Sequence, residues 1–248
     1  MRIISLVPSF TEMLFDFELQ DQIVGRTRFC ERPAHKVKDI KVIGGTKNPK
    51  IDKIKQLKPD FVIASKEENR KRDVEELRGF THVHVTDVKT VKDAMASIHE
   101  LGRLLGREKQ ASKILSAVKR EMGRIPLIKP ATAAYFIWRK PWMSVGGDTY
   151  INDVMQQWGL ENIYAEEKRY PEIILEKLAD AQPEFILLSS EPFPFKEKHV
   201  QEVVQCCPNS SVVLIDGQWF SWYGSRMVEA FGELNEWRAV IKGESGSV

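Results

Sequence analysis

The sequence has few residues that could fix its structure by covalent or metal cross-links. Only three cysteines occur, and two of them, Cys206 and Cys207, are neighbours in the chain, where a mutual disulfide would be strained. We therefore expect free thiols, which are typical of a reducing compartment. His82 and His84 would share one face of a strand, and Cys30 could serve a soft metal, but neither is joined by further ligands at a recognisable spacing. The sequence therefore predicts no metal site.

Signatures of catalysis and nucleotide binding are also missing. Neither the phosphate-binding pattern G-x-x-x-x-G-K-[ST] nor the dinucleotide pattern G-x-G-x-x-G occurs, and no G-x-S-x-G motif places a nucleophilic serine. The glycines at 44–45 and 146–147 instead predict turns at which the backbone can approach another group closely. We assign no catalytic residue, and we expect a protein that is not an enzyme and has no cofactor.

Neither a strong charge nor a long apolar segment is present. The 248 residues carry a net charge of +2, and basic side chains are mixed with acids, as in residues 66–72 (KEENRKR). We therefore expect a small-molecule partner and neither nucleic acid nor a membrane surface. The apolar segment 2–6 follows Met1 directly, with no room for a signal peptide, and no run is long enough to span a bilayer. This predicts a cytoplasmic protein, whereas a signal removed upstream would make it periplasmic or cell-surface.

The most informative pattern is a phrase that occurs twice. Residues 51–65 read IDKIKQLKPDFVIAS, and residues 175–189 read LEKLADAQPEFILLS. Each copy predicts a short helix, a proline that stops it and an apolar strand. Other elements recur around the copies in the same order, which favours two similar α/β lobes with mostly parallel sheets. Because small molecules often bind between lobes, we predict a ligand cleft between these two.

A long helical stretch separates the predicted lobes. Apolar residues recur at helical spacing from Val91 onward, and Gly106 is expected to cause a bend. We predict two Rossmann-like lobes joined by this single long α-helix. The predicted boundaries are 1–90 for the N-terminal lobe, 91–125 for the connecting helix, 126–242 for the C-terminal lobe and 243–248 for a disordered tail.

Two predicted helix starts could point free amides at a ligand. Ser9 and Glu12 form the pattern of a capping box, and Asp148 is placed to cap a helix over 150–158. Both starts follow the first strand of their lobe, so their amides would suit carbonyls, amides or an anion. Ordinary capping is an alternative explanation for Ser9.

Aromatic residues form the clearest candidate for a binding surface. Four of the six tryptophans lie in two short segments, 138–142 (WRKPW) and 219–223 (WFSWY), and each segment follows a predicted strand. The α/β proteins bind ligands at this edge of the sheet, where tryptophans offer flat walls to a planar or macrocyclic ligand. Packing within a lobe is an alternative for the first segment. The candidates from this pattern are Trp219, Trp138, Trp142, Tyr170 and Phe29.

The order of these segments resembles the helical-linker (class III) substrate-binding proteins of ABC importers, and within them the cobalamin-binding branch, whose relatives bind ferric siderophores and haem. The segments that carry the resemblance are 5–14 (SLVPSFTEML), 42–65, 101–108 (LGRLLGRE), 145–164 (VGGDTYINDVMQQWGLENIY), 178–189 and 216–226 (DGQWFSWYGSR). The resemblance implies two lobes on a stiff helix, with the ligand held by aromatic residues of the cleft and little lobe closure. It implies that Trp219 and Phe220 are an aromatic pair that contacts the ligand.

This chain also departs from the family at several positions. In the cobalamin binders a tryptophan tends to stand near 65–69 (SKEEN), where this chain has Ser65 and Lys66, and we include Lys66 among the ligand-binding candidates. Receptors that dock on an importer permease carry a glutamate on each lobe, but Lys71 and Ser221 occupy those positions here. In the first lobe Glu67, Glu68 or Glu75 would be substitutes, and in the second lobe the loop itself offers none.

We therefore predict non-catalytic binding of a corrinoid such as cobalamin, or of a related metal–organic ligand. One alternative is a signal-bearing ABC importer receptor for cobalamin, a siderophore or haem. Another is an enzyme that acts on a cofactor precursor in the same cleft.

Overall fold

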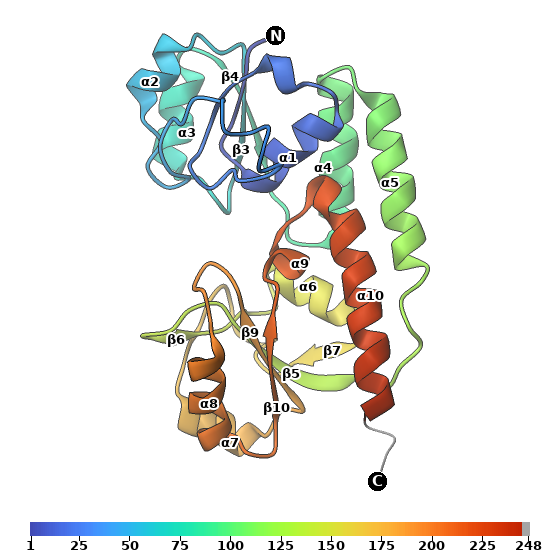
Figure 1. Ribbon diagram of the computed structural model, residues 1–248. Coiled ribbons are helices and arrows are strands. Elements are labelled where there is room, and N and C mark those ends of the chain that lie inside the picture. The colour runs from blue at the N-terminus through green and yellow to red at the C-terminus, as the bar shows by residue number, and fades with distance from the viewer. Residues whose placement is uncertain (245–248) are drawn as a thin grey trace. The chain divides into compact units, whose positions relative to one another are not determined.

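A computed structural model provides the structure, and it describes residues 1–244. The chain forms two compact units, each built around its own four-stranded parallel sheet (Figure 1). This confirms the predicted α/β class with two lobes. The first unit comprises Met1–Val88, Lys92–Val118 and Trp222–Val228, and the second comprises Lys89–Val91, Lys119–Ser221 and the chain from Glu229. The units thus group the chain differently from the predicted boundaries, because segment 222–228 belongs to the first unit.

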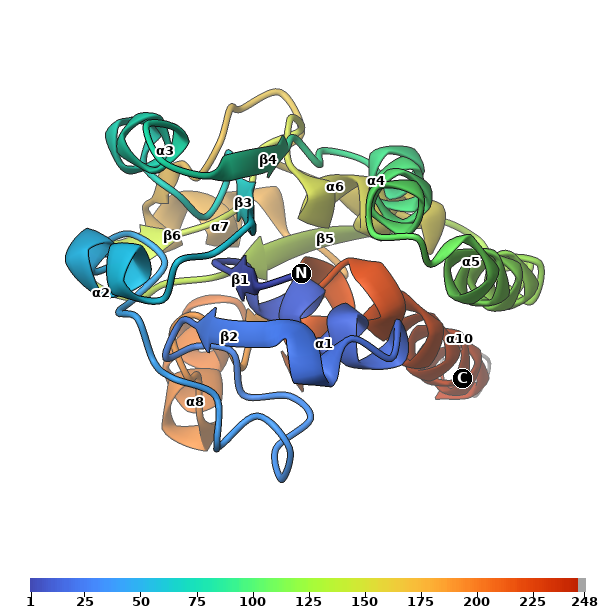
Figure 2. The same cartoon turned by 90° about the horizontal axis from the view of Figure 1, so that it is seen from above.

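The sheet of the first unit has the order β2-β1-β3-β4. Its strands are β1 (Ile3–Ser5), β2 (Ile23–Arg26), β3 (Phe61–Ser65) and β4 (His82–Thr86). Its helical elements are α1 (Pro8–Asp16), η1 (Gln20–Gln22), α2 (Ile51–Gln56), α3 (Lys71–Arg78), most of α4 (Val91–Leu104) and α5 (Glu108–Met122), and η2 (Gly224–Arg226). Figure 2 shows α2 and α3 on one face of this sheet and α1 and α4 on the other. Because helices cover both faces of the sheet, β1 and β3 are buried along their whole length, and both are apolar up to a final serine.

The sheet of the second unit has the order β10-β9-β5-β7, and a two-stranded antiparallel ribbon pairs β6 with β8. The strands are β5 (Ala131–Phe136), β6 (Trp142–Met143), β7 (Leu160–Asn162), β8 (Glu172–Ile173), β9 (Phe185–Ser189) and β10 (Ser211–Ile215). The helices are α6 (Tyr150–Gln157), α7 (Leu175–Ala181), α8 (Glu197–Cys206), α9 (Gln218–Ser221) and α10 (Met227–Glu244). Helices α7 and α8 cover one face of the sheet, and α6 and α10 cover the other (Figure 1).

The repeated phrase forms the same structure in both units. Its first copy is α2 followed by β3, and its second copy is α7 followed by β9. In each copy a residue in the left-handed region, Lys58 (φ 44°) or Gln182 (φ 43°), precedes the proline that prevents the helix from continuing. Leu178 of α7 packs with Ile186 and Leu188 of β9 in a buried cluster, which corresponds to the packing of Ile54 against β3 in the first unit.

The predicted long helix is interrupted. Instead of one helix over 91–125, α4 ends at Leu104 and α5 begins at Glu108. Gly106 lies between them at φ 62°, a conformation that a residue with a side chain adopts only with strain. The bend expected near Gly106 is therefore a complete break, and α4 and α5 lie side by side (Figure 1).

The C-terminal end of the chain also differs from the prediction. Helix α10 continues through Glu244, so the predicted disorder is wrong for residues 243–244. The rest of that predicted tail, 245–248, lies outside the described residues. Helix α10 is anchored to the second unit by Trp158, whose ring lies 4.4 Å from that of Phe231 and whose indole N–H donates to Asn235 at 2.9 Å.

Candidate functional site

In each unit, the carboxyl ends of the parallel strands carry most of the predicted binding residues. In the first unit, Phe29 lies on the loop after β2, and the residue is 45% exposed. Lys66 lies directly after β3, where its Nζ atom is 2.5 Å from an Asp87 carboxylate oxygen. Both side chains are available at this edge of the sheet, as their prediction requires. Contact of these two side chains with a ligand stays a prediction.

Ser9 does not form the predicted capping box. The residue before α1 is Val7, Pro8 occupies the first helical turn, and no side chain caps the helix. Ser9 is therefore inside the helix and is 4% exposed, so its hydroxyl has little access to a ligand. Glu12 does not take part in capping either. Its carboxylate accepts a hydrogen bond from the Arg226 guanidinium, with an Nε–Oε2 distance of 3.0 Å.

Two serines at the ends of repeated strands hold the loops of this edge in place. In the first unit the Tyr223 hydroxyl donates to Ser65 Oγ at 3.1 Å, and the backbone N–H of Glu67 donates to the same oxygen at 3.1 Å. In the second unit the Tyr135 hydroxyl donates to Ser189 Oγ at 3.1 Å. Burial raises the pKa of both tyrosines well above its usual range. No local pattern predicts these two bonds, because each tyrosine is distant in the chain from its serine.

The first tryptophan segment of the second unit divides into an exposed and a packed residue. Trp138 is 40% exposed, and its ring meets Phe193 edge to face at 5.7 Å. Trp142 lies in β6 and stacks on Phe195 at 5.6 Å, against the cluster under α7 and α8. Trp138 therefore retains exposed surface for a ligand, whereas the Trp142 ring packs mostly against other residues of the second unit.

The second tryptophan segment divides in the same way. Trp219 is partly exposed in the short helix α9, directly after β10. Its neighbour Phe220 is 0% exposed and packs against Tyr135 at 5.1 Å. The assignment of Phe220 to ligand contact is therefore wrong for the structure described, because a fully buried ring offers no surface. Phe220 instead supports the loop that presents Trp219.

The remaining predicted features of the second unit are explained by contacts within it. Tyr170 is partly exposed, and the Arg169 guanidinium lies 5.2 Å from its ring centroid. Asp148 does not cap α6, because Thr149 accepts from the N–H of Asn152, and Asp148 instead accepts from the backbone of Arg169 at 2.6 Å. A Cβ atom added to Gly147 would lie 2.0 Å from a backbone oxygen, so this glycine pair permits a close approach of the chain to itself.

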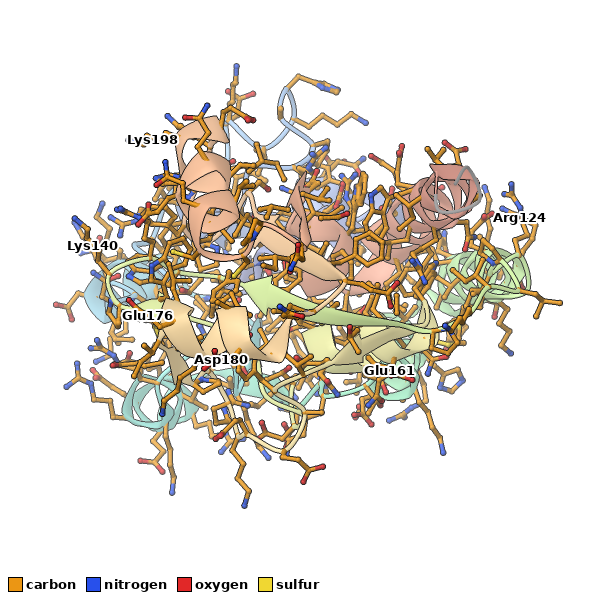
Figure 3. The ribbon with its side chains drawn as sticks, turned by 90° about the horizontal axis from the view of Figure 1, so that it is seen from below. Arg124, Lys140, Glu161, Glu176, Asp180 and Lys198 are labelled. Carbon is orange, nitrogen blue, oxygen red and sulfur yellow. The ribbon has the colours of Figure 1, made fainter. Side chains whose placement is uncertain are left out.

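The positions expected for importer docking are occupied by Lys71 and Ser221, yet carboxylates are close to both. Lys71 begins α3, and its Nζ atom is 3.7 Å from a Glu75 oxygen. Ser221 Oγ lies 2.9 Å from Glu191 Oε1, so an acid from the loop after β9 reaches the place where the local sequence has none. The second-lobe loop itself was expected to offer no acid close by, and the carboxylate at Ser221 comes from a different loop. More generally, the surface of the second unit carries charges of both signs, among them Lys140, Glu161, Glu176, Asp180 and Lys198 (Figure 3).

Within residues 1–244, no group of three or more histidine, cysteine or acidic side chains is placed to hold a metal ion. His82 and His84 stack along the Phe61 ring instead, at 5.1 and 6.3 Å. Cys30 is fully buried and accepts a hydrogen bond from the Thr11 hydroxyl at 3.0 Å, and burial raises the pKa of its thiol. In the same part of the chain, none of the helices has the length and apolar composition needed to cross a membrane.

Comparison with known proteins identifies the family. The family model described as "Periplasmic binding protein" matches residues 3–206. The chain is 25% identical over 241 residues to a vitamin B12-binding protein of Pectobacterium carotovorum, covering 94% of this chain and 86% of that protein. It is also 25% identical over 253 residues to an ABC transporter substrate-binding lipoprotein of Bacillus subtilis, covering 95% of this chain and 79% of that protein.

A solved structure supports the fold independently. The periplasmic vitamin B12-binding protein of Vibrio cholerae superimposes on this chain with a TM-score of 0.82, at 22% sequence identity, with 97% of each chain covered. At this identity the similarity establishes the two-lobed fold, and it is consistent with the family that the sequence pattern indicated.

Proposed function

Since the chain belongs to the periplasmic binding protein family, we propose that it binds a corrinoid and carries out no reaction on it. The observation that carries this proposal is the placement of exposed aromatic rings at the carboxyl ends of the strands in both units. Phe29 is exposed in the first unit, and Trp138 and Trp219 retain exposed surface in the second. Flat apolar side chains at this edge of an α/β sheet suit a macrocycle. The vitamin B12-binding relatives support a corrin ring as that macrocycle.

A parallel titration tests the proposal. Purified protein is titrated with cobalamin, cobinamide, haem and a ferric siderophore, followed by absorbance and confirmed by calorimetry, which is insensitive to ligand colour. We expect saturable binding of the corrinoids at micromolar concentration or below. Saturable binding of haem or the siderophore alone would assign the site to another ligand of the same family. Consumption of any of the ligands, detected by mass spectrometry after incubation, would contradict the proposal that the protein is not an enzyme.

Delivery to an ABC importer is a second candidate function, and one observation favours it. Glu191 and Glu75 bring a carboxylate to each position at which importer receptors of this family are expected to carry one. The Bacillus subtilis relative described as an ABC transporter substrate-binding lipoprotein supports such a partner. We expect Glu191→Gln and Glu75→Gln to weaken capture by an importer permease in detergent. Glu161→Gln, which changes an exposed acid away from these positions, serves as the control (Figure 3).

A further inference from the structure

The first unit contains two pairs in which a cation lies over an exposed aromatic ring. The Arg28 guanidinium is 4.8 Å from the ring centroid of Phe29, and the Lys55 ammonium is 5.4 Å from that of Phe80. Phe29 and Phe80 are exposed to similar extents, 45% and 37%. The pairs differ in position, because Phe29 follows β2 at its carboxyl end, whereas Phe80 precedes β4 at its amino end.

The loop that carries Arg28 and Phe29 is held firmly. Cys30 is fully buried, its backbone N–H donates to Thr27 at 3.2 Å, and its sulfur accepts from Thr11. Gly45 lies against both exposed side chains, since a Cβ atom added to it would be 3.4 Å from the Phe29 ring and 3.6 Å from Arg28 Nε. The backbone N–H of Arg28 donates to the carbonyl of Gly44 at 2.9 Å. A ligand would therefore meet a cation and a ring whose positions are set by the fold.

The Arg28 side chain has different partners from Lys66 and Lys47, two other cations near these strand ends. Lys66 is paired with Asp87, and Lys47 donates to the backbone carbonyl of Glu67. Among residues 1–244, by contrast, the Arg28 guanidinium makes neither a hydrogen bond nor an ion pair, and it lies over the Phe29 ring. An arginine that rests on an aromatic face keeps its N–H groups in a planar fork, which matches a carboxylate in two parallel hydrogen bonds.

We infer that the Arg28–Phe29 pair recognises a carboxylate on the ligand, and that the ligand is a corrinoid with free carboxylates rather than a fully amidated one. The Phe29 ring supplies apolar contact to the macrocycle, and Arg28 bonds the acid at its rim. The inference rests on the proposed function, because it specifies the chemistry of the ligand for the same edge of the first unit.

The test uses two probes that differ only in these acids. Cobyrinic acid and its full methyl ester share one corrin ring, and calorimetry gives the affinity of the full-length protein for each. We expect the acid to bind at least ~10-fold more tightly than the ester, since only the acid can form a charge-assisted pair with the Arg28 guanidinium. Arg28→Gln should lower the affinity for the acid to about that for the ester, so that the preference for the acid is lost. Phe29→Ala should weaken the binding of both.

The second cation–aromatic pair provides the matched controls. Lys55→Gln and Phe80→Ala remove the same kinds of group from the other end of the sheet, and neither should change the affinity for either probe. Equal affinity of the wild type for acid and ester, or a preference that persists in Arg28→Gln, would overturn the inference while leaving corrinoid binding intact. Failure of the wild type to bind acid, ester and cobalamin would overturn the proposed function, and the inference with it.

Discussion

The Tyr223 hydroxyl donates a hydrogen bond to Ser65 Oγ at 3.1 Å, within the first unit. Ser65 closes the first copy of the repeated phrase, and Ser189, which closes the second, accepts the same bond from Tyr135 at the same distance. The N–H two residues further along, of Glu67 or Glu191, donates to each serine as well. The two units thus stabilise corresponding loops with the same group, although the tyrosines come from unrelated positions in the chain.

The two buried tyrosines predict a loss of stability at alkaline pH. Burial holds the pKa of Tyr135 and Tyr223 above the value of about 10 found in an unfolded chain. Above pH ~10 the unfolded state therefore releases protons that the folded state keeps, and the free energy of unfolding falls by up to about 1.4 kcal/mol per pH unit for each tyrosine. Below pH ~10 this contribution is fully present. Urea unfolding from pH 8 to 11 measures it.

Phenylalanine variants attribute the effect to these residues. Tyr135→Phe and Tyr223→Phe each remove one buried hydrogen bond and should cost about 1 kcal/mol at neutral pH. Each should also flatten the decline above pH ~10. Tyr170→Phe, at a partly exposed tyrosine, is the control. An alkaline decline of unchanged steepness in the double variant would mean that other groups cause it.

We expect alanine substitutions at the adjacent residues Trp219 and Phe220 to affect different properties, ligand binding for the first and stability for the second. Trp219→Ala should weaken ligand binding by roughly 1–3 kcal/mol with little change in stability, because the ring is partly exposed beyond a strand end. Phe220→Ala should lower the free energy of unfolding by about 3–5 kcal/mol, because it removes a fully buried ring that packs on Tyr135. Calorimetry and urea unfolding of both variants separate the two effects. Unfolding of Trp219→Ala, or unchanged affinity, would place Trp219 in the core.

The break between α4 and α5 gives a prediction about the backbone. Gly106 has φ 62°, and an added Cβ atom would meet nothing within 4 Å, so conformation rather than space decides the cost of a substitution. Gly106→Ala should lower the free energy of unfolding by about 1 kcal/mol, and Gly106→Asn by less, because asparagine tolerates this region better. Gly79→Ala, at a glycine with φ −65°, is the control. An equal cost for alanine at both positions would exclude conformational strain as the reason.

Local patterns predicted the elements of this fold because they act within a few residues. In both copies of the repeat, a proline and an apolar strand fix the end of the helix and the start of the strand, and α2–β3 and α7–β9 follow. The parallel sheets were predictable for the same reason, since strands such as β3 and β9 are mostly apolar and the strands alternate with helices.

The details of the site depend on distant contacts that local patterns cannot contain. Trp219 and Phe220 look alike in the sequence, but the short helix α9 turns one ring into the core beside Tyr135. Ser221 meets a carboxylate only because the loop after β9 lies beside it. The Ser9 pattern fits a capping box, yet its acid, Glu12, pairs with an arginine 214 residues away.

That arginine, Arg226, gives a prediction about a nearly buried ion pair. Its side chain is 6% exposed and that of Glu12 is 13% exposed, and together they join α1 to segment 222–228 within the first unit. Arg226→Met leaves the Glu12 carboxylate without its partner and should cost about 3–5 kcal/mol, whereas replacing both residues by Glu12→Leu and Arg226→Met should cost much less. Urea unfolding of the single and double variants at pH 7 tests this.

The pH dependence of Arg226→Met provides a second readout. Burial raises the pKa of Glu12 above 4.5 even with Arg226 present, and loss of the arginine removes the main influence that lowers it. A carboxyl whose pKa is higher in the folded state stabilises the fold at low pH and loses that contribution as pH rises. Arg226→Met should therefore recover part of its lost stability as the pH falls from 7 toward 5, whereas the double variant should not. A parallel pH profile for the single and double variants would show that the cost of Arg226→Met comes from lost packing rather than from the stranded carboxylate.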